Sequence, residues 1–598
     1  MQTRPEAGQE AGCEVQPPPP QRAVHLDPAQ DAPPTQPSRS SRQASRPDVC
    51  AKVLDFEAAR RERKLTQQQA ADELGVARTT LLGWVARAGG TTLTPAQRAF
   101  FESPDGVQFL RVLLVAALFT MNLCGGLGVA MVRTFFSLTG LHALVACSES
   151  SLRKARNAMI VATGAWGDAQ DAALSKGMTP KEIIGGVDEN FHEAMMLVAM
   201  ESVSGFLLVE KASERRDGKT WARALREGLA KWPVRLVGLI GDEAKGLIRC
   251  ALEELGVLKG SDLFHVQHEI CRGVSGAMGR LVRAAEKARD KARDTVAAVK
   301  KERESYERTT HGPGRPPAWS SCEDAAALAL GVAEAQVAQA QAHREAVRAS
   351  VRDLGERYHP VDLTTGALLS PEAVESRLLE GFDAVWASAA RAGLGDRSAR
   401  VIDSIAKAQR VLPSLVGWVT AWHRMVRERI AALGLSASES AWVLASLLPA
   451  VYLDRVVHRG ASAAFRDRVG AVRDGLVAAI EAVGSPWRTW DAVTRARVLV
   501  VVETCADLFV RTSSYVEGRN GQLSLHHHRT HHITPALLKA LTVIHNYVLT
   551  RRDGTTAAER FTGQKHEDLF AHLVTVIMPP ARPRARKRKV RAPMLAAA

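Results

Sequence analysis

Apolar residues alternate or cluster at strand length between residues 181 and 272. Five such runs predict strands: Ile183–Asp188, Met195–Met200, Gly205–Val209, Val234–Ile240 and Leu263–Val266. Amphipathic patterns predict helices over Gly218–Leu229 and Ala244–Leu255. Three strands, a helix, a strand, a helix and a strand follow one another in this order. That order is typical of an α/β fold with a mixed sheet, in which a hairpin meander precedes parallel strands.

Helical periodicity predominates on both sides of this region. Residues 93–180 form a predicted helical linker domain, and residues 273–500 form a longer all-helical domain. Within the latter, Arg280–Arg308 is dense in charged residues and alanine, which predicts a long solvated helix or a helical hairpin. The segment His311–Pro317 contains the glycines and prolines of a helix breaker. Four tryptophans occupy expected core positions: Trp386, Trp418, Trp422 and Trp442.

One uncharged segment, Val112–Val132, is long enough to cross a membrane. Asn122 lies in its middle, and glycines at Gly125, Gly126 and Gly128 interrupt it. A continuous spanning helix rarely carries such a cluster of breakers. The pattern therefore predicts buried helices, and we expect no membrane association.

Residues 51–92 contain a pattern typical of a helix-turn-helix DNA-binding domain. A short helix with small apolar residues reaches Leu74, Gly75 permits a tight turn, and a second helix begins at Ala77. The first residues of this second helix, predicted to face the major groove, are Arg78, Thr79 and Thr80. An ordinary helical hairpin is the alternative interpretation.

The two ends of the chain differ in composition from the rest. Residues 1–50 are rich in Pro, Gln, Ser and Arg, which predicts a disordered tail. Residues 578–598 form a predicted disordered basic tail, expected to bind phosphates, with a merely solubilising end as the alternative. Its basic residues are Arg582, Arg584, Arg586, Lys587, Arg588, Lys589 and Arg591.

The formal net charge of +15 favours a polyanionic partner, either nucleic acid or an anionic membrane surface. The eight cysteines are scattered and include no C-x-x-C pair. A disulfide framework or a zinc knuckle is therefore not expected, and a reducing cytoplasm is favoured.

Two acidic residues follow predicted strands that are expected to be neighbours. Asp188 ends the first strand and Asp242 follows the fourth, so their carboxylates are expected to meet at one edge of the sheet. Neighbouring carboxylates repel each other unless a cation lies between them, and Mg²⁺ prefers such oxygen ligands. Alternatives remain for both positions. Asp188 has acidic rivals in Glu189 and Glu193, and Asp242 has a rival in Glu243 and is itself a candidate helix cap.

Four stretches together resemble the RNase H-like transposase and integrase superfamily, whose members carry two Asp and one Glu. They are Val187-Asp188-Glu189, Gly241–Leu247, Phe264-His265-Val266 and Ser513–Leu523. The last is similar to the T-N-x-x-E-x-x-N-x-x-L element that carries the final Glu in several bacterial transposases, although Ser513-Ser514 replaces the Thr-Asn pair. This similarity identifies Glu517 as the third acid.

The resemblance implies an RNase H-like core formed by residues 181–272 and 501–577 and interrupted by the helical insertion of residues 273–500. It implies two Mg²⁺ (or Mn²⁺) ions held by Asp188, Asp242 and Glu517. It also implies two auxiliary residues, His265, which matches a family histidine, and Asn520, one turn after Glu517. The expected partners are the terminal repeats of a mobile element and target DNA, bound by a homodimer or larger assembly in the bacterial cytoplasm, associated with the nucleoid.

Each of these assignments has a structural alternative. Ser514 and Glu517 have the spacing of a capping box, and Glu503 and Asp507 are rival acids. His265 and Asn520 also fit purely structural roles. Near the final acid, the residues expected to touch DNA are Arg519, His528 and Arg529, although the histidines of His526–His532 also permit a metal site.

The expected activity is metal-dependent phosphodiester cleavage followed by strand transfer, as in a DNA transposase. Two other functions use the same features. A non-catalytic DNA-binding regulator or domesticated transposase needs only the helix-turn-helix and the basic tail, and a nuclease of the same fold cuts DNA without joining it.

Overall fold

The structure is a computed structural model in which the chain divides into two compact units, residues 1–92 and residues 93–598. It describes residues 94–191, 194–394, 399–460, 462–530 and 533–578, together with residues 60, 62–63, 65–73, 77–79 and 82.

The described part of the first unit centres on helix α2 (Gln67–Glu73), in which Ala70 and Ala71 are fully buried. Arg78 and Thr79 are helical and exposed. The turn predicted at Leu74–Val76 and the predicted DNA contact Thr80 lie outside the described residues. The helix-turn-helix therefore stays a prediction.

The second unit begins with helices that lead into the sheet. They are α4 (Pro95–Glu102), α5 (Pro104–Ala117), the π-helix η2 (Leu118–Cys124), α6 (Val129–Leu138), the short η3 (Leu141–Ala143) and the long α7 (Glu149–Gly177). The predicted break in the apolar segment is confirmed, because η2 ends before Gly125 and α6 begins after Gly128. Two helical stretches, Pro104–Cys124 and Ala437–Arg459, are long and apolar enough to cross a membrane by length and composition alone. In their most apolar 18-residue segments, 44% and 39% of the residues are buried within the protein.

A five-stranded mixed sheet forms the centre of the second unit. Its strands are β1 (Lys181–Phe191), β2 (Met195–Glu201), β3 (Leu207–Ala212), β4 (Val234–Gly241) and β5 (Leu258–Ser261), in the order β3-β2-β1-β4-β5. The first three pair antiparallel, and β4 and β5 run parallel to β1 and to each other. The expected neighbourhood of the first and fourth strands is confirmed.

The prediction of a fifth strand at Leu263–Val266 is wrong. These residues open helix α10 (Leu263–Glu307), and Asp262 caps it by accepting a hydrogen bond from the Phe264 N–H at 2.7 Å. The true fifth strand, Leu258-Lys-Gly-Ser261, has too little apolar character to be recognised by pattern. His265 consequently lies in the first turn of a helix.

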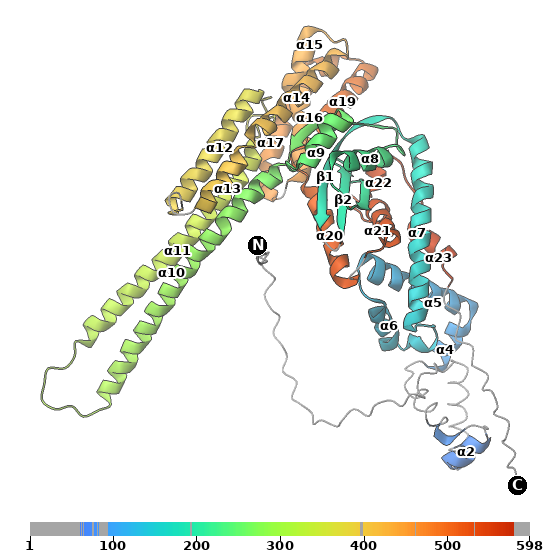
Figure 1. Ribbon diagram of the computed structural model, residues 1–598, viewed down its shortest axis with the longest axis horizontal. Helices are drawn as coiled ribbons and strands as arrows, with labels where there is room; N and C mark the ends of the chain where they lie inside the picture. The colour runs from blue at the N-terminus through green and yellow to red at the C-terminus, as the bar shows by residue number, and fades with distance from the viewer. Residues whose placement is uncertain are drawn as a thin grey trace, which may run out of the picture. The chain divides into compact units, whose positions relative to one another are not determined.

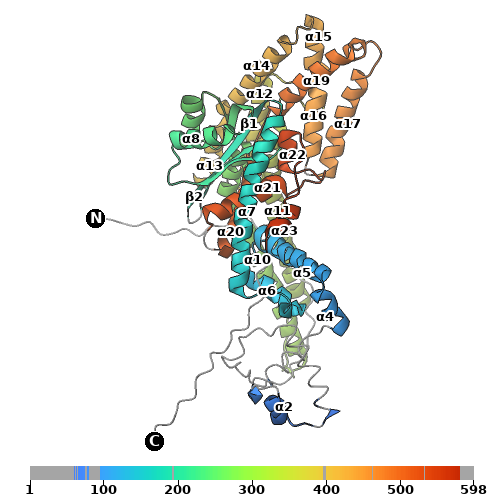
Figure 2. The same cartoon turned by 90° about the vertical axis from the view of Figure 1, so that its right-hand side faces the viewer.

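Between β3 and β5 the chain forms α8 (Gly218–Leu229), on the residues predicted, and then α9 (Lys245–Arg249) continued by the π-helix η4 (Cys250–Leu255). Helices α7 and α21 (Pro535–Tyr547) lie side by side next to the sheet (Figures 1 and 2). The remaining helices after the insertion are α20 (Ser514–Thr530), α22 (Ala557–Thr562) and α23 (Leu569–Val576).

In the described part of residues 273–500 every named element is a helix, as predicted, apart from an isolated bridge between Val361 and Leu368. Helices α10 and α11 (Trp319–Arg357) form an antiparallel hairpin, with the predicted breaker segment at its turn (Figure 1). The other helices are α12 (Pro371–Arg391), α13 (Ala399–Gln409), α14 (Leu412–Ala431), α15 (Ala437–Trp442), η5 (Val443–Leu447), α16 (Leu448–Arg459), α17 (Ala463–Ile480), α18 (Pro486–Thr489) and α19 (Ala492–Asp507). The predicted boundaries of this helical segment, residues 273 and 500, are not element ends: residue 273 lies inside α10 and residue 500 inside α19.

Trp418 of α14 joins the insertion to the sheet. Its side chain is 1% exposed and shares a core with Ile184 of β1 and Ile240 of β4. Gly238 and Gly260 make room for the indole, because an added Cβ would lie 2.8 and 2.9 Å from its ring atoms. The insertion therefore packs against one face of the sheet, and even-numbered residues of β1 point to that face. Trp422 is also fully buried, whereas Trp386 and Trp442 are half-buried.

Candidate active site

Asp188 lies inside β1, three residues before the end of the strand, and not at the strand end predicted for it. As an even-numbered residue it points to the same face as Ile184, where it is buried. Glu189 points to the other face, where its carboxylate accepts a hydrogen bond from the Trp221 indole at 3.0 Å and pairs with Arg216. Glu189 is thereby separated from Asp188, and Glu193 lies outside the described residues.

Asp242 follows β4 directly, and the parallel register of β1 and β4 sets it beside Asp188. Its Oδ1 accepts a hydrogen bond from the Ala244 N–H at 3.0 Å. This bond lies in the turn before α9, whose N-cap is Ala244 and which has no side-chain cap, so the helix-cap alternative for Asp242 is wrong. Glu243 turns toward β5, where Ser261 donates to its carboxylate and Lys259 lies 3.5 Å away.

Glu517 lies in the first turn of α20, which packs against β1. Its Oε1 is 3.9 Å from Nε2 of His265, and its side chain is about one-third exposed. At the start of this helix Ser513 donates a short hydrogen bond to Asp262. The rival acids Glu503 and Asp507 instead lie beside Arg455 of α16.

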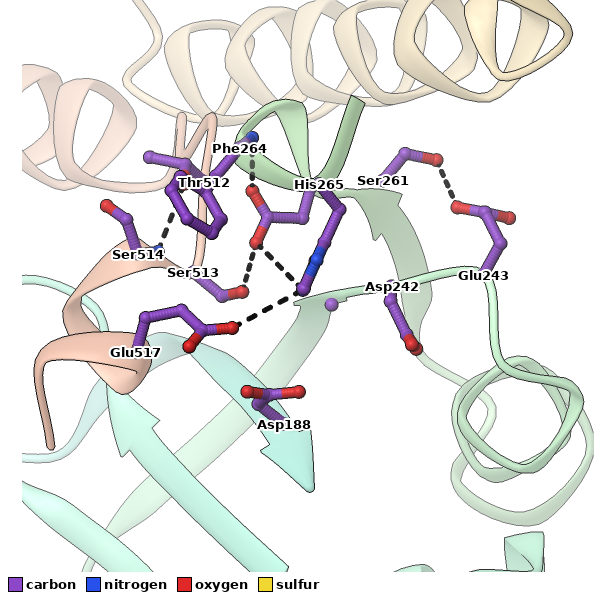
Figure 3. A network of polar contacts seen from close by, with 12 residues as sticks. Asp188, Asp242, Glu243, Ser261, Phe264, His265, Thr512, Ser513, Ser514 and Glu517 are labelled. Carbon is purple, nitrogen blue, oxygen red and sulfur yellow. Dashed lines mark hydrogen bonds and ion pairs between the residues drawn. The ribbon is translucent and has the colours of Figure 1, made fainter. Parts of the chain in front are cut away.

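Three side chains from distant parts of the sequence converge. One ligand atom each of Asp188, His265 and Glu517 lies within 4.8 Å of the other two, and Figure 3 shows the three directed toward one another, with Asp242 beside them. Asp242 is not within this short range of the group.

His265 Nε2 is buried at the centre of this group. It lies 3.7 Å from Asp262 Oδ2, and within the described part of the chain it has no hydrogen-bond partner. Asp262, fully buried at the side chain, was not recognised in the sequence. Asp262 lies three residues before His265, and this spacing was the sequence signal that could have placed the two side chains together. A buried nitrogen without a partner costs free energy, so a ligand at this position would stabilise it.

Burial raises the pKa of the Asp188 carboxyl well above its usual range, and the nearby charges of Glu517 and Asp242 raise it further. Closely placed carboxylates favour a cation between them. Carboxylate oxygens suit Mg²⁺ and Mn²⁺, whereas an imidazole nitrogen is a more usual ligand of Zn²⁺ or Fe²⁺. The two carboxylates of the group therefore fit the expected divalent metal, and the histidine is not required as a ligand.

Asn520 reaches the group from α20. Its Nδ2 donates a hydrogen bond to Asp188 Oδ2 at 2.7 Å, and its Oδ1 is buried without a hydrogen-bond partner in the part of the chain that the structure describes. The amide therefore orients the carboxylate on β1 from the helix that carries Glu517.

Arg519 does not occupy the position expected of a DNA contact. Its guanidinium forms a buried pair with Glu210 of β3, with distances of 2.7 and 2.8 Å, and Thr542 donates to the same carboxylate. The side chain is 5% exposed, which leaves no surface for a phosphate. We correct the assignment to a structural role.

Of the other residues expected to contact DNA, His528 lies on α20 and is exposed. The side chain of Arg529, and His531 and His532, lie outside what the structure describes. The same holds for the basic tail, whose predicted contacts are Arg584, Arg586, Lys587, Arg588 and Lys589.

Residues 443–589 match the profile of a protein family described as a family of unknown function, DUF6399. The matched segment carries Glu517 and Asn520 but neither Asp188 nor Asp242. No curated protein matches the chain.

Proposed function

We propose that this protein is a DNA transposase that cleaves and joins phosphodiester bonds with divalent metal ions. The observation that carries the proposal is the convergence of Asp188, His265 and Glu517 from β1, α10 and α20, within 4.8 Å of one another. Asp242, directly after the neighbouring strand β4, adds a third acid. The net charge of +15 supports a nucleic-acid substrate.

In this proposal Asp188, Asp242 and Glu517 hold the metal ions. Divalent ions of this kind activate an attacking oxygen and stabilise the leaving oxygen in phosphoryl transfer. His265 presents Nε2 to the same space, where it positions a phosphate oxygen or completes the ligand set. Asn520 keeps the Asp188 carboxylate oriented. The protein thus contributes positioning and charge, without a covalent intermediate.

The test is a reaction on labelled duplex DNA that carries the sequences flanking the gene, incubated with Mg²⁺ or Mn²⁺. A transposase releases a 3′ hydroxyl at the element end and joins it to a second duplex. Cleavage that is never followed by joining would favour the nuclease alternative. Tight binding with no cleavage by either metal would overturn the proposal in favour of a DNA-binding regulator.

A further inference from the structure

One face of α10 leads away from the candidate active site and carries four basic residues, and the acid in the same sector, Glu269, pairs with Lys407 of α13. Its four basic residues are exposed: Arg272, Arg280, Arg283 and Lys287. At 3.6 residues per turn, these four and His265 fall within a sector of about 80° around the helix axis. The face therefore continues the active site along the outside of the helix.

The four basic side chains of this face lack acidic partners. None of them makes an ion pair or a hydrogen bond within the described residues. On the same helix, by contrast, Arg289 pairs with Asp290 and Arg303 pairs with Glu307. Unpaired charges along one face are available to an external polyanion.

Gly276 lies on the same face, between Arg272 and Arg280. A Cβ there would come no closer than 3.8 Å to any neighbour, so packing within the protein does not require this glycine. Gly273, just beyond the edge of this face, differs, because a Cβ there would lie 1.8 Å from Ser404 of α13. A glycine inside a helix costs roughly 0.5–1 kcal/mol relative to alanine. At Gly276 it leaves the helix backbone open to close approach from outside.

We infer that this face of α10 binds the phosphate backbone of duplex DNA on the side leading away from the cleaved bond. From Arg272 to Lys287 the helix rises by about 22 Å, which corresponds to roughly six or seven base pairs along one strand. Phosphate contacts of this kind set the position of the duplex and do not read its sequence. The inference rests on the proposed function, since it locates the DNA of that reaction.

The test compares the double variant Arg280→Ala/Arg283→Ala with a control of equal charge, Arg424→Ala/Arg427→Ala on α14. Binding of a labelled mixed-sequence duplex of about 30 base pairs is measured by fluorescence anisotropy at several salt concentrations, with EDTA present. We expect the slope of log affinity against log salt to fall by about two in the first variant and to stay unchanged in the control.

A third variant, Gly276→Leu, adds bulk without changing charge. It is expected to weaken binding while the melting temperature stays the same or rises. An unchanged slope in Arg280→Ala/Arg283→Ala, or an equal fall in the control, would overturn the inference. Because this assay scores no cleavage, its result is separate from the proposed chemistry. A protein that joins DNA but shows no change in slope refutes the α10 surface alone, and one that shows the change without any chemistry refutes the transposase alone.

Discussion

Asn520 on α20 donates a 2.7 Å hydrogen bond to Asp188 on β1. This bond ties the helix that carries Glu517 to the buried carboxylate at the centre of the sheet. The distance between the two acids therefore depends on a side chain that is neither an acid nor a predicted metal ligand.

Replacement of Asn520 by alanine is expected to lower metal affinity and single-turnover cleavage by roughly 10- to 100-fold, because an unsupported carboxylate orients a cation poorly. The measurement is the cleavage rate as a function of Mg²⁺ concentration. Saturating metal should restore part of the rate. A rate that stays at the wild-type value at every metal concentration would contradict the positioning role.

Gly186 gives Tyr515 the space in which it lies. A Cβ at position 186 would be 2.1 Å from the Tyr515 Oη, so Gly186→Ala must displace α20 from β1. We expect a loss of about 1–3 kcal/mol in the free energy of unfolding, measured by denaturant titration. The control is Gly518→Ala on α20, where an added Cβ meets nothing within 4 Å. The control should be neutral or stabilising, and equal losses in both variants would refute the steric argument.

Trp418→Ala is expected to cost about 3–5 kcal/mol, because it leaves a cavity between the insertion and the sheet. Trp386→Ala, at a half-buried position of α12, serves as the comparison and should cost less. Calorimetry provides a second readout. If the helical insertion depends on Trp418 to dock on the sheet, Trp418→Ala should unfold in two transitions where the wild type shows one. Equal stability losses in Trp418→Ala and Trp386→Ala would argue against this role of Trp418.

Arg519→Ala leaves the Glu210 carboxylate buried without its partner, which is expected to cost about 3–5 kcal/mol of stability. Replacing both residues with apolar side chains of similar size, as in Arg519→Met/Glu210→Leu, should recover much of that loss. If Arg519→Ala were instead as stable as wild type but weaker in DNA binding, the original assignment of Arg519 as a DNA contact would be restored.

The sheet could be predicted largely from local patterns, because β1 to β4 are apolar and α8 is strongly amphipathic. The fifth strand could not, since its central residues Lys259 and Gly260 are polar or small and its burial comes from distant Trp418. The same limitation applies to Arg519. In the sequence it is a basic residue beside the final acid, and only the fold brings Glu210 to it.

The candidate site was predictable in its acids but not in its detailed geometry. Asp188 and Asp242 follow from strand order, and Glu517 follows from a resemblance to a known motif. The role of Asp262 depends on a helix that begins where a strand was expected. The bond from Asn520 to Asp188 joins residues far apart in the sequence, so no local pattern indicates it.

The most direct measurement is single-turnover cleavage of DNA with Mg²⁺ or with EDTA, for the wild type, Asp188→Asn, Glu517→Gln and the neighbouring-acid control Glu243→Gln. The account predicts cleavage that needs the metal, that falls by on the order of a thousandfold (about 4 kcal/mol of barrier) in the first two variants and that persists in the control. All variants should bind DNA. Cleavage by Asp188→Asn and Glu517→Gln at the rate of the control would contradict the account.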